Sequence, residues 1–218
     1  MRTITHLAKP DSIAPTIAVL LPCAYGTPED FEREGFISAV SERALEIDIV
    51  LADMNLEQIT NGTALTLLRD TIITDALQAG YTNIILMGIS IGGFMAISYA
   101  VHYPEEIDNI YLIAPYLGNR MITDEIISAG GILRWSSTNN SEDDHERRAW
   151  QWLKTEANHT TKVHLGYGNS DRFAAAHKML ADLLASDQVE VLHGGHEWST
   201  WRNIWDRFLD RGITHQHR

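Results

Sequence analysis

The sequence predicts an α/β fold, in which a mostly parallel sheet of about six strands carries helices on both faces. Short apolar runs rich in branched residues alternate with longer segments of helical period, which is the order expected of strand–helix–strand units. Each run is almost continuously hydrophobic, as in strands buried on both faces. Of the 218 residues, 44% are hydrophobic, enough to fill one core of ordinary size. We therefore expect a single domain over residues 1–218.

The predicted elements follow one another along the chain. The expected strands are residues 17–21, 47–52, 84–87, 110–114, 163–167 and 189–192. Helical periodicity predicts helices between them at about 29–44, 63–79, 92–102, 172–186 and 197–210. Sequential strands joined by helices pair in parallel, so their carboxyl ends are expected at one edge of the sheet.

The stretch 117–161 departs from this alternation. It joins two predicted strands with far more residues than one crossover helix requires, and we expect a helical cap inserted there. Ser141 followed by Asp144 is typical of a capping box at the start of a helix, whose apolar face would include Trp150 and Leu153. The sequence leaves open whether this helix packs on the sheet or covers the substrate as a lid.

Composition excludes several classes of partner. The formal charge of −12 would be repelled by nucleic-acid phosphates and by anionic membranes. The longest apolar run near the N-terminus, residues 17–21, is too short for a membrane span or a secretory segment. A single cysteine, Cys23, cannot form an intramolecular disulfide, which agrees with a reducing compartment. We expect a cytoplasmic protein that binds neither nucleic acid nor membranes.

The strongest functional signal is the segment 88–93, Gly-Ile-Ser-Ile-Gly-Gly, which lies between a predicted strand and a predicted helix. A serine at such a sharp turn has a strained backbone and an exposed Oγ, and the flanking glycines remove Cβ atoms that would collide with strand and helix. The turn also places the N–H of Ile91 at a helix N-terminus, where it can stabilise an oxyanion. We interpret Ser90 as a nucleophile.

A serine nucleophile requires a base and a carboxylate that orients the base. His196 follows the last predicted strand and two glycines, and a tight turn there can direct its imidazole over the sheet edge. His193, at the strand end, is the competitor. Asp171 follows the strand 163–167 in a turn-rich loop, although it could instead cap the next helix. Asp108 is a weaker alternative because it begins a strand, at the opposite edge.

The segments 88–92, 168–171 and 194–198 resemble the α/β-hydrolase superfamily, particularly its small serine esterase and thioesterase members. Their order along the chain, Ser90, Asp171 and His196, is the order of that superfamily. The resemblance extends from about residue 17 to residue 209. It implies a catalytic triad of these three residues.

The resemblance also implies that the second oxyanion donor lies in the loop after the first predicted strand. Many relatives have His-Gly there, whereas this chain has Pro22-Cys23-Ala24-Tyr25. Since the donor is a backbone N–H, Tyr25 is the first candidate and Ala24 the second. Tyr25 could also line the acyl pocket. Some relatives use a cysteine nucleophile, but in this chain serine occupies that position and we interpret Cys23 as a packing residue.

We expect a serine hydrolase that cleaves a small carboxylic ester or thioester through an acyl-enzyme, without a cofactor or metal. The same residues could serve an acyltransferase, a peptidase or a carbon–carbon bond hydrolase, and the chain could also be a non-catalytic ligand-binding homologue. Trp135, Trp150 and Trp152 are either apolar walls for a substrate or core residues. The acidic composition disfavours strongly anionic substrates unless a local pocket overrides it. The oligomeric state cannot be read from the sequence.

Overall fold

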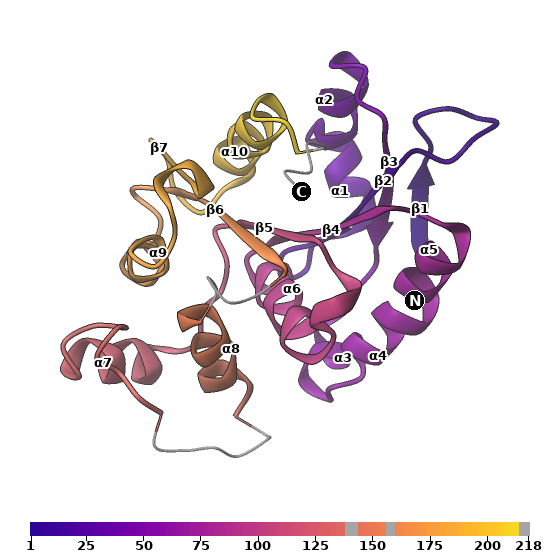
Figure 1. Cartoon of the computed structure of the whole chain (residues 1–218). Helices are drawn as coiled ribbons and strands as arrows, with labels where there is room; N and C mark the ends of the chain where they lie inside the picture. Colours follow the sequence, from indigo (N-terminus) through magenta and orange to yellow (C-terminus); the bar gives the residue numbers. More distant parts are fainter. Residues whose placement is uncertain (138–143, 156–159, 214–218) are drawn as a thin grey trace.

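The computed structural model describes residues 1–137, 144–155 and 160–213. Within them one twisted sheet of seven strands runs through the molecule in the order β1-β3-β2-β4-β5-β6-β7 (Figure 1). The strands are β1 (Thr3–His6), β2 (Thr16–Leu21), β3 (Ile47–Ala52), β4 (Asn83–Ile89), β5 (Asn109–Ile113), β6 (Lys162–Gly168) and β7 (Val189–Leu192). All neighbouring pairs are parallel except β1 with β3. The mostly parallel α/β sheet expected from the sequence is confirmed.

Six of the strands coincide with the predicted apolar runs, and β1 is an addition. Its four residues, Thr-Ile-Thr-His, alternate between exposed and half-buried side chains. It forms the sheet edge and pairs antiparallel with β3, with Thr3 opposite Ala52. Only one of its residues is hydrophobic, so an edge strand this short leaves no apolar run in the sequence.

Helices cover both faces of the sheet (Figure 1). They are α1 (Pro28–Arg33), α2 (Phe36–Glu42), α3 (Leu56–Thr60), α4 (Ala64–Leu68), α5 (Thr74–Ala79), α6 (Ile91–His102), α7 (Arg120–Ser128), α8 (His145–Lys154), α9 (Ala174–Ala181) and α10 (Trp198–Asp210). A π-helical turn at Arg69–Ile73 joins α4 to α5. The helix expected at 29–44 is divided into α1 and α2 at Gly35, whose φ of 81° ends the first and begins the second.

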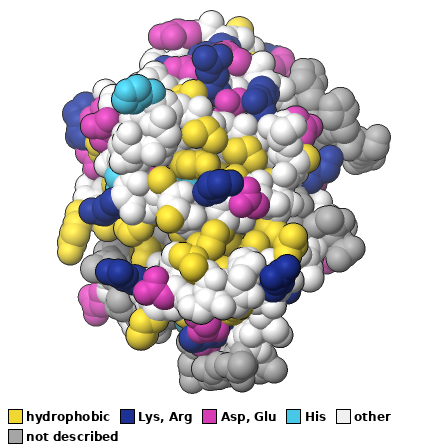
Figure 2. Space-filling view, turned by 90° about the vertical axis from the view of Figure 1, so that its left-hand side faces the viewer, with side chains coloured by type: hydrophobic (Ala, Val, Ile, Leu, Met, Phe, Trp, Pro, Cys, Tyr) yellow, Lys and Arg dark blue, Asp and Glu magenta, His cyan; other side chains and the backbone are white. Residues whose placement is uncertain are grey.

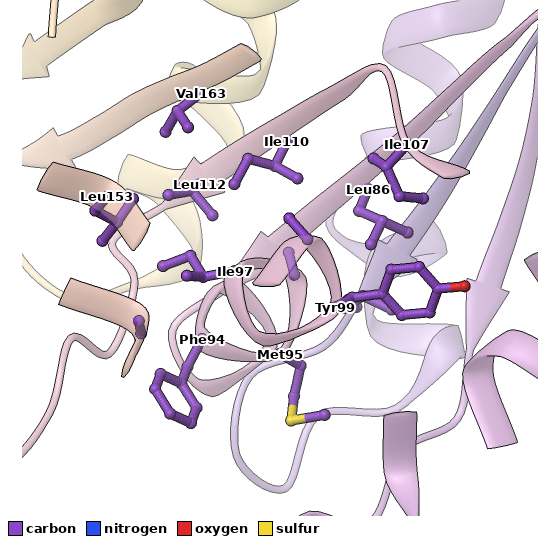
Figure 3. Packing of buried hydrophobic residues seen from close by; sticks show 14 of the residues in the cluster. Leu86, Phe94, Met95, Ile97, Tyr99, Ile107, Ile110, Leu112, Leu153 and Val163 are labelled. Atoms are coloured by element: carbon purple, nitrogen blue, oxygen red, sulfur yellow. The ribbon is translucent and has the colours of Figure 1, made fainter. Parts of the chain in front are cut away.

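The two faces of the sheet are buried against different helices. Alternate residues of one strand point to opposite faces, so that Val19 joins the larger core cluster and Ala18 the smaller. In the larger cluster, Ile97 of α6 lies beside Leu112 of β5 and Leu153 of α8 (Figure 3). The smaller cluster packs α1, α2 and α10 on the other face. Each central strand is therefore buried on both sides, which explains its continuous apolar sequence.

The segment 117–161 contains α7 and α8 between β5 and β6. The described part of α8 begins at His145, and Asp144 is its N-cap, accepting a hydrogen bond from Arg147 N–H at 3.1 Å. Asp144 therefore does not occupy the third helical position expected of it in a capping box, and Ser141 lies outside the described residues. Trp150 and Leu153 are buried as predicted.

The tryptophans of this segment are core residues. Trp135, Trp150 and Trp152 all belong to the larger cluster, and Trp150 Nε1 donates to the Leu117 carbonyl at 2.7 Å. Of the two interpretations that the sequence left open, burial favours the one as core residues. Hydrophobic side chains also lie on the surface: they gather over the middle of the face at the left of Figure 1, with single charged groups among them (Figure 2).

Gly166 in β6 allows α10 to lie against the sheet. A Cβ on this residue would overlap Ile204 Cγ2 of the helix. Gly166→Ala is therefore expected to lower the free energy of unfolding by about 1–3 kcal/mol through overpacking, measured by urea unfolding. Because Ile204→Ala removes the opposing methyl group, the double variant is expected to lose less stability than the sum of the single losses. Additive losses would contradict this packing.

Candidate active site

The loops that carry the three sequence-predicted site residues meet at one edge of the sheet. Ser90 follows β4, Asp171 follows β6 and His196 follows β7. These strands are parallel: β5 alone separates β4 from β6, and β7 is the next neighbour of β6. In open α/β sheets this carboxyl edge is where ligands bind.

Ser90 occupies a strained turn between β4 and α6. Its φ of 54° and ψ of −113° lie where a residue with a Cβ rarely occurs, at a cost of about 1–3 kcal/mol. Two backbone hydrogen bonds hold it: Ser90 N–H donates to the Ile113 carbonyl at 3.0 Å, and Tyr116 N–H donates to the Ser90 carbonyl at 2.8 Å. The chain that leaves β5 thus fixes the serine on both sides.

Gly92 brings the first turn of α6 against the end of β2. A Cβ on Gly92 would overlap the carbonyl oxygen of Leu21 and would lie 2.6 Å from that of Pro22. Only glycine permits this approach. It places the loop after β2 directly beside the serine turn.

The serine, imidazole and carboxylate form a continuous hydrogen-bonded series. His196 Nε2 lies 3.1 Å from Ser90 Oγ, and His196 Nδ1 lies 2.7 Å from Asp171 Oδ2. Since an ionised carboxylate only accepts, Nδ1 carries the proton and Nε2 is free to accept from the serine hydroxyl. This tautomer is the one that a general base requires.

Asp171 is buried and ionised. Burial opposes its charge, but hydrogen bonds from His196 and from the Phe173 N–H, the latter at 2.8 Å, outweigh it and lower the pKa of this carboxyl below its usual 3.8. The helix that follows begins only at Ala174. Asp171 therefore holds the turn before α9 with one oxygen and contacts the imidazole with the other. The N-cap of α9 is Phe173, so Asp171 is not the helix cap that the sequence left open.

Backbone hydrogen bonds join the loop after β6 to the loop after β7. Asn169 N–H donates to the Leu192 carbonyl at 2.8 Å, and Ser170 N–H donates to the Gly194 carbonyl at 2.9 Å. The relative position of Asp171 and His196 is thus set by main-chain contacts and does not depend on their side chains alone.

Aromatic rings hold the imidazole from two directions. Phe173 and Trp201 lie edge-on to the His196 ring, with centroids 5.3 Å and 5.0 Å away. Tyr116 lies next to Phe173, at 6.3 Å. Sequence reasoning did not predict Phe173 or Tyr116 at the site, and it considered Trp201 only as part of the pattern after His196 that resembles the esterases, without a contact to the imidazole.

The competing candidates lie elsewhere. His193 is exposed. Asp108 accepts a hydrogen bond from Ile84 N–H at the amino end of β4, opposite the site. Cys23 is partly buried, and burial raises the pKa of its thiol, which disfavours the thiolate that a cysteine nucleophile needs.

The candidate oxyanion donors lie on two sides of Ser90. Ile91 is the first residue of α6. At this position the backbone N–H has no hydrogen-bond acceptor within the helix, and it lies at the positive end of the helix dipole. Ala24 and Tyr25 form a turn in the loop after β2, and Tyr25 has a φ of 61°. The Tyr25 side chain is 90% exposed, so it does not form a buried wall of an acyl pocket.

The described residues contain no cluster of three or more His, Cys, Asp or Glu side chains that could hold a metal ion. In the same part of the chain, no helix combines the length and the apolar composition of a bilayer span.

Comparison with known proteins identifies the family. Residues 66–205 match the putative esterase family. The chain belongs to this family. The esterase matches none of the curated proteins at the level of sequence. Family membership, with a serine at the nucleophile turn, makes it a serine ester hydrolase.

Solved structures resemble the esterase in fold. FphF, a fluorophosphonate-binding serine hydrolase of Staphylococcus aureus, has a TM-score of 0.72 at 13% identity, covering 98% of this chain and 92% of that one. S-formylglutathione hydrolase FrmB of Staphylococcus aureus has a TM-score of 0.64 at 14% identity, covering 91% and 82%. Est1E from Butyrivibrio proteoclasticus, with ferulic acid bound, has a TM-score of 0.65 at 14% identity, covering 98% and 96%. At such low identity the likeness establishes the α/β-hydrolase fold.

A buried histidine in α9 stabilises the chain segment that holds Ser90. His177 is fully buried in α9, and its Nε2–H donates to the Pro115 carbonyl at 2.9 Å. Pro115 precedes Tyr116, which holds the Ser90 carbonyl. Burial lowers the pKa of His177 from 6.5 to about 4. His177 is therefore a neutral structural donor at neutral pH.

This histidine predicts a pH-dependent stability. Burial also lowers the pKa of His164 to about 4, whereas both histidines titrate near 6.5 when the chain unfolds. Between these values the unfolded chain binds more protons, so the free energy of unfolding should fall as the pH decreases from about 6.5 to 4, by up to about 1.4 kcal/mol per pH unit for each histidine.

Urea unfolding at pH 6.5 and pH 5 measures this effect. His177→Gln, whose amide can still donate to the Pro115 carbonyl, is expected to lose roughly half of the pH dependence because one of the two histidines is removed. The exposed His193, changed to Gln, is the matched control. Equal pH dependence in the two variants would contradict the assignment.

Proposed function

We propose that the esterase hydrolyses a carboxylic ester or thioester through an acyl-enzyme intermediate, with Ser90 as nucleophile, His196 as general base and Asp171 as the orienting acid. The observation that carries this proposal is the hydrogen-bonded series from Ser90 Oγ through His196 to Asp171. Such a series, beside a helix N-terminus, is the arrangement that acyl transfer to water requires.

The proposed reaction has two halves. His196 Nε2 takes the Ser90 proton while Oγ attacks the carbonyl carbon, and the alcohol or thiol leaves with the proton that His196 returns. Water then attacks the acyl group with His196 again as base, which releases the acid and restores Ser90. Asp171 keeps Nδ1 protonated and stabilises the imidazolium in both halves.

The oxyanion hole is proposed to combine the Ile91 N–H with an N–H of the loop after β2. Contact between Gly92 and the carbonyls of Leu21 and Pro22 supports the choice of this loop, because it lies next to the serine turn. Tyr25 is the first candidate and Ala24 the second. A backbone donor at this position tolerates the absence of the His-Gly pair.

The remaining parts of the proposal concern the whole chain. We propose one catalytic domain in which the segment 117–161 caps the site. Tyr116, just before this segment, and Asn119, near its start, both donate to the Glu146 carboxylate, at 2.5 Å from Oε1 and 2.8 Å from Oε2. This contact fastens α8 to the chain that holds the Ser90 carbonyl. A small-molecule substrate and a cytoplasmic location complete the proposal, the latter supported by the single cysteine.

Replacing Ser90 by Ala tests the nucleophile. Labelling by a fluorophosphonate is expected to disappear, and kcat/KM for 4-nitrophenyl butyrate is expected to fall by about 10⁴-fold or more. Ser98→Ala, which removes a buried hydroxyl from the same helix, is the control and should keep both. Labelling that survives in Ser90→Ala would overturn the proposal, and absence of labelling in the unmodified protein would favour a ligand-binding homologue.

Asp171→Asn tests the role of the carboxylate. Because the Phe173 N–H can only donate, the amide oxygen of the asparagine should remain on it and direct the NH₂ group at His196 Nδ1. The imidazole would then protonate at Nε2, and kcat should decrease by about 10³–10⁴-fold. Asp108→Asn is the control because it lies at the opposite edge of the sheet. Comparable activity in the two variants would remove Asp171 from the triad.

A further inference from the structure

Arg172 is a cation without a carboxylate partner beside the active site. Several arginines are paired with carboxylates, as Arg69 is with Glu106 and Arg147 with Glu125. Among the described residues Arg134 and Arg207 also lack an ion pair, but neither contacts a ring that touches His196. Within the described residues Arg172 makes no ion pair, and its side chain is exposed. In a chain with 29 acidic and 17 basic residues, a free guanidinium at the site is a specific feature.

The guanidinium is held next to the catalytic imidazole through one ring. Arg172 Cζ lies over the Phe173 ring, 4.8 Å from its centroid, and the edge-on contact of Phe173 with His196 follows at 5.3 Å. The Phe173 N–H also donates to Asp171, so this ring is attached to the triad by its backbone as well. Stacking of the planar cation on a fixed ring limits where its charge can lie.

The adjacent carboxylate does not neutralise this cation. Asp171 Oδ2 faces His196 and its Oδ1 accepts from the Phe173 N–H, so its charge is directed into the protein while the Arg172 side chain is exposed. The donors of the guanidinium therefore remain available. A guanidinium offers paired N–H groups that match the two oxygens of a carboxylate.

Because the chain has an overall charge of −12, the Arg172 cation affects how an anionic substrate binds. Most of the surface repels anions, so a negatively charged substrate would be favoured only where a local positive group faces it. Arg172 carries such a group within two successive ring contacts of the imidazole.

We propose that Arg172 is a specificity-determining residue that binds a carboxylate on the substrate. The preferred substrate is an ester or thioester that carries this carboxylate a few bonds from the scissile carbonyl, on the acyl or on the leaving-group side. The inference rests on the proposed function, because it places the scissile carbonyl at Ser90.

Two matched pairs of esters test it. 4-Nitrophenyl valerate is compared with the 4-nitrophenyl monoester of glutaric acid, which differs by a carboxylate on the acyl side. Phenyl acetate is compared with 4-acetoxybenzoate, which carries the carboxylate on the leaving group. The readout is the ratio of kcat/KM for the anionic ester to that for its neutral partner, with rates in Ser90→Ala subtracted as background.

In at least one pair, Arg172→Gln is expected to lower this ratio by about fivefold, the effect of one charged contact at a partly exposed position. Arg172→Lys keeps the charge and should keep most of the ratio. Lys178→Gln removes the same charge from the exposed face of α9, where Lys178 pairs with Asp182 at 2.8 Å, and should leave the ratio unchanged. Added salt should lower the ratio of the unmodified protein, because it screens the contact.

The outcomes separate the two proposals. Hydrolysis that depends on Ser90, with ratios that are the same in the unmodified protein and in Arg172→Gln for both pairs, would overturn the assignment of Arg172 and leave the esterase mechanism in place. An equal decrease in Arg172→Gln and Lys178→Gln would likewise overturn it, since net charge would then be the cause. Absence of Ser90-dependent hydrolysis of all four esters would overturn the proposed function and this inference with it.

Discussion

Parallel pairing of β4, β5, β6 and β7 is the constraint on which the site depends. It brings the loops that follow these strands to one edge, although the residues that they carry are more than a hundred positions apart in the chain, as Ser90 and His196 are. Both faces of the central strands are packed against helices, so a slip by one residue would exchange the side chains that fill the two core clusters. The geometry of the triad is therefore a consequence of core packing.

The site is held by backbone contacts more than by its own side chains. The chain leaving β5 contacts Ser90 on both sides, and the loops after β6 and β7 are joined by main-chain hydrogen bonds. Strain at Ser90 is compatible with this arrangement because the surrounding contacts over-determine its conformation. His177 extends the support to α9, where a neutral buried imidazole holds the Pro115 carbonyl. A rigid frame of this kind keeps reacting groups in place without reorganisation during the reaction.

In the two proposals, one loop serves both catalysis and substrate choice. Residues 171–173 supply, in order, the carboxylate that orients His196, a cation at the rim and the ring on which that cation rests. A buried charge and an exposed charge of opposite sign are thus one residue apart, directed to different sides. This separation lets the imidazole keep its carboxylate partner while the rim keeps an available cation.

The sequence by itself determined the parallel α/β sheet, because strands buried on both faces leave continuous apolar runs. It also predicted a site of Ser90, Asp171 and His196, because each follows such a run with turn-forming glycines, and these three side chains lie in hydrogen-bonding reach of one another. It could not reveal β1, whose polar edge residues leave no such run, or the break at Gly35. Only the tertiary structure decided the contacts of Phe173, Trp201 and His177, and the position of Arg172. These depend on packing between segments distant in the chain, and no local pattern encodes which side chains meet there.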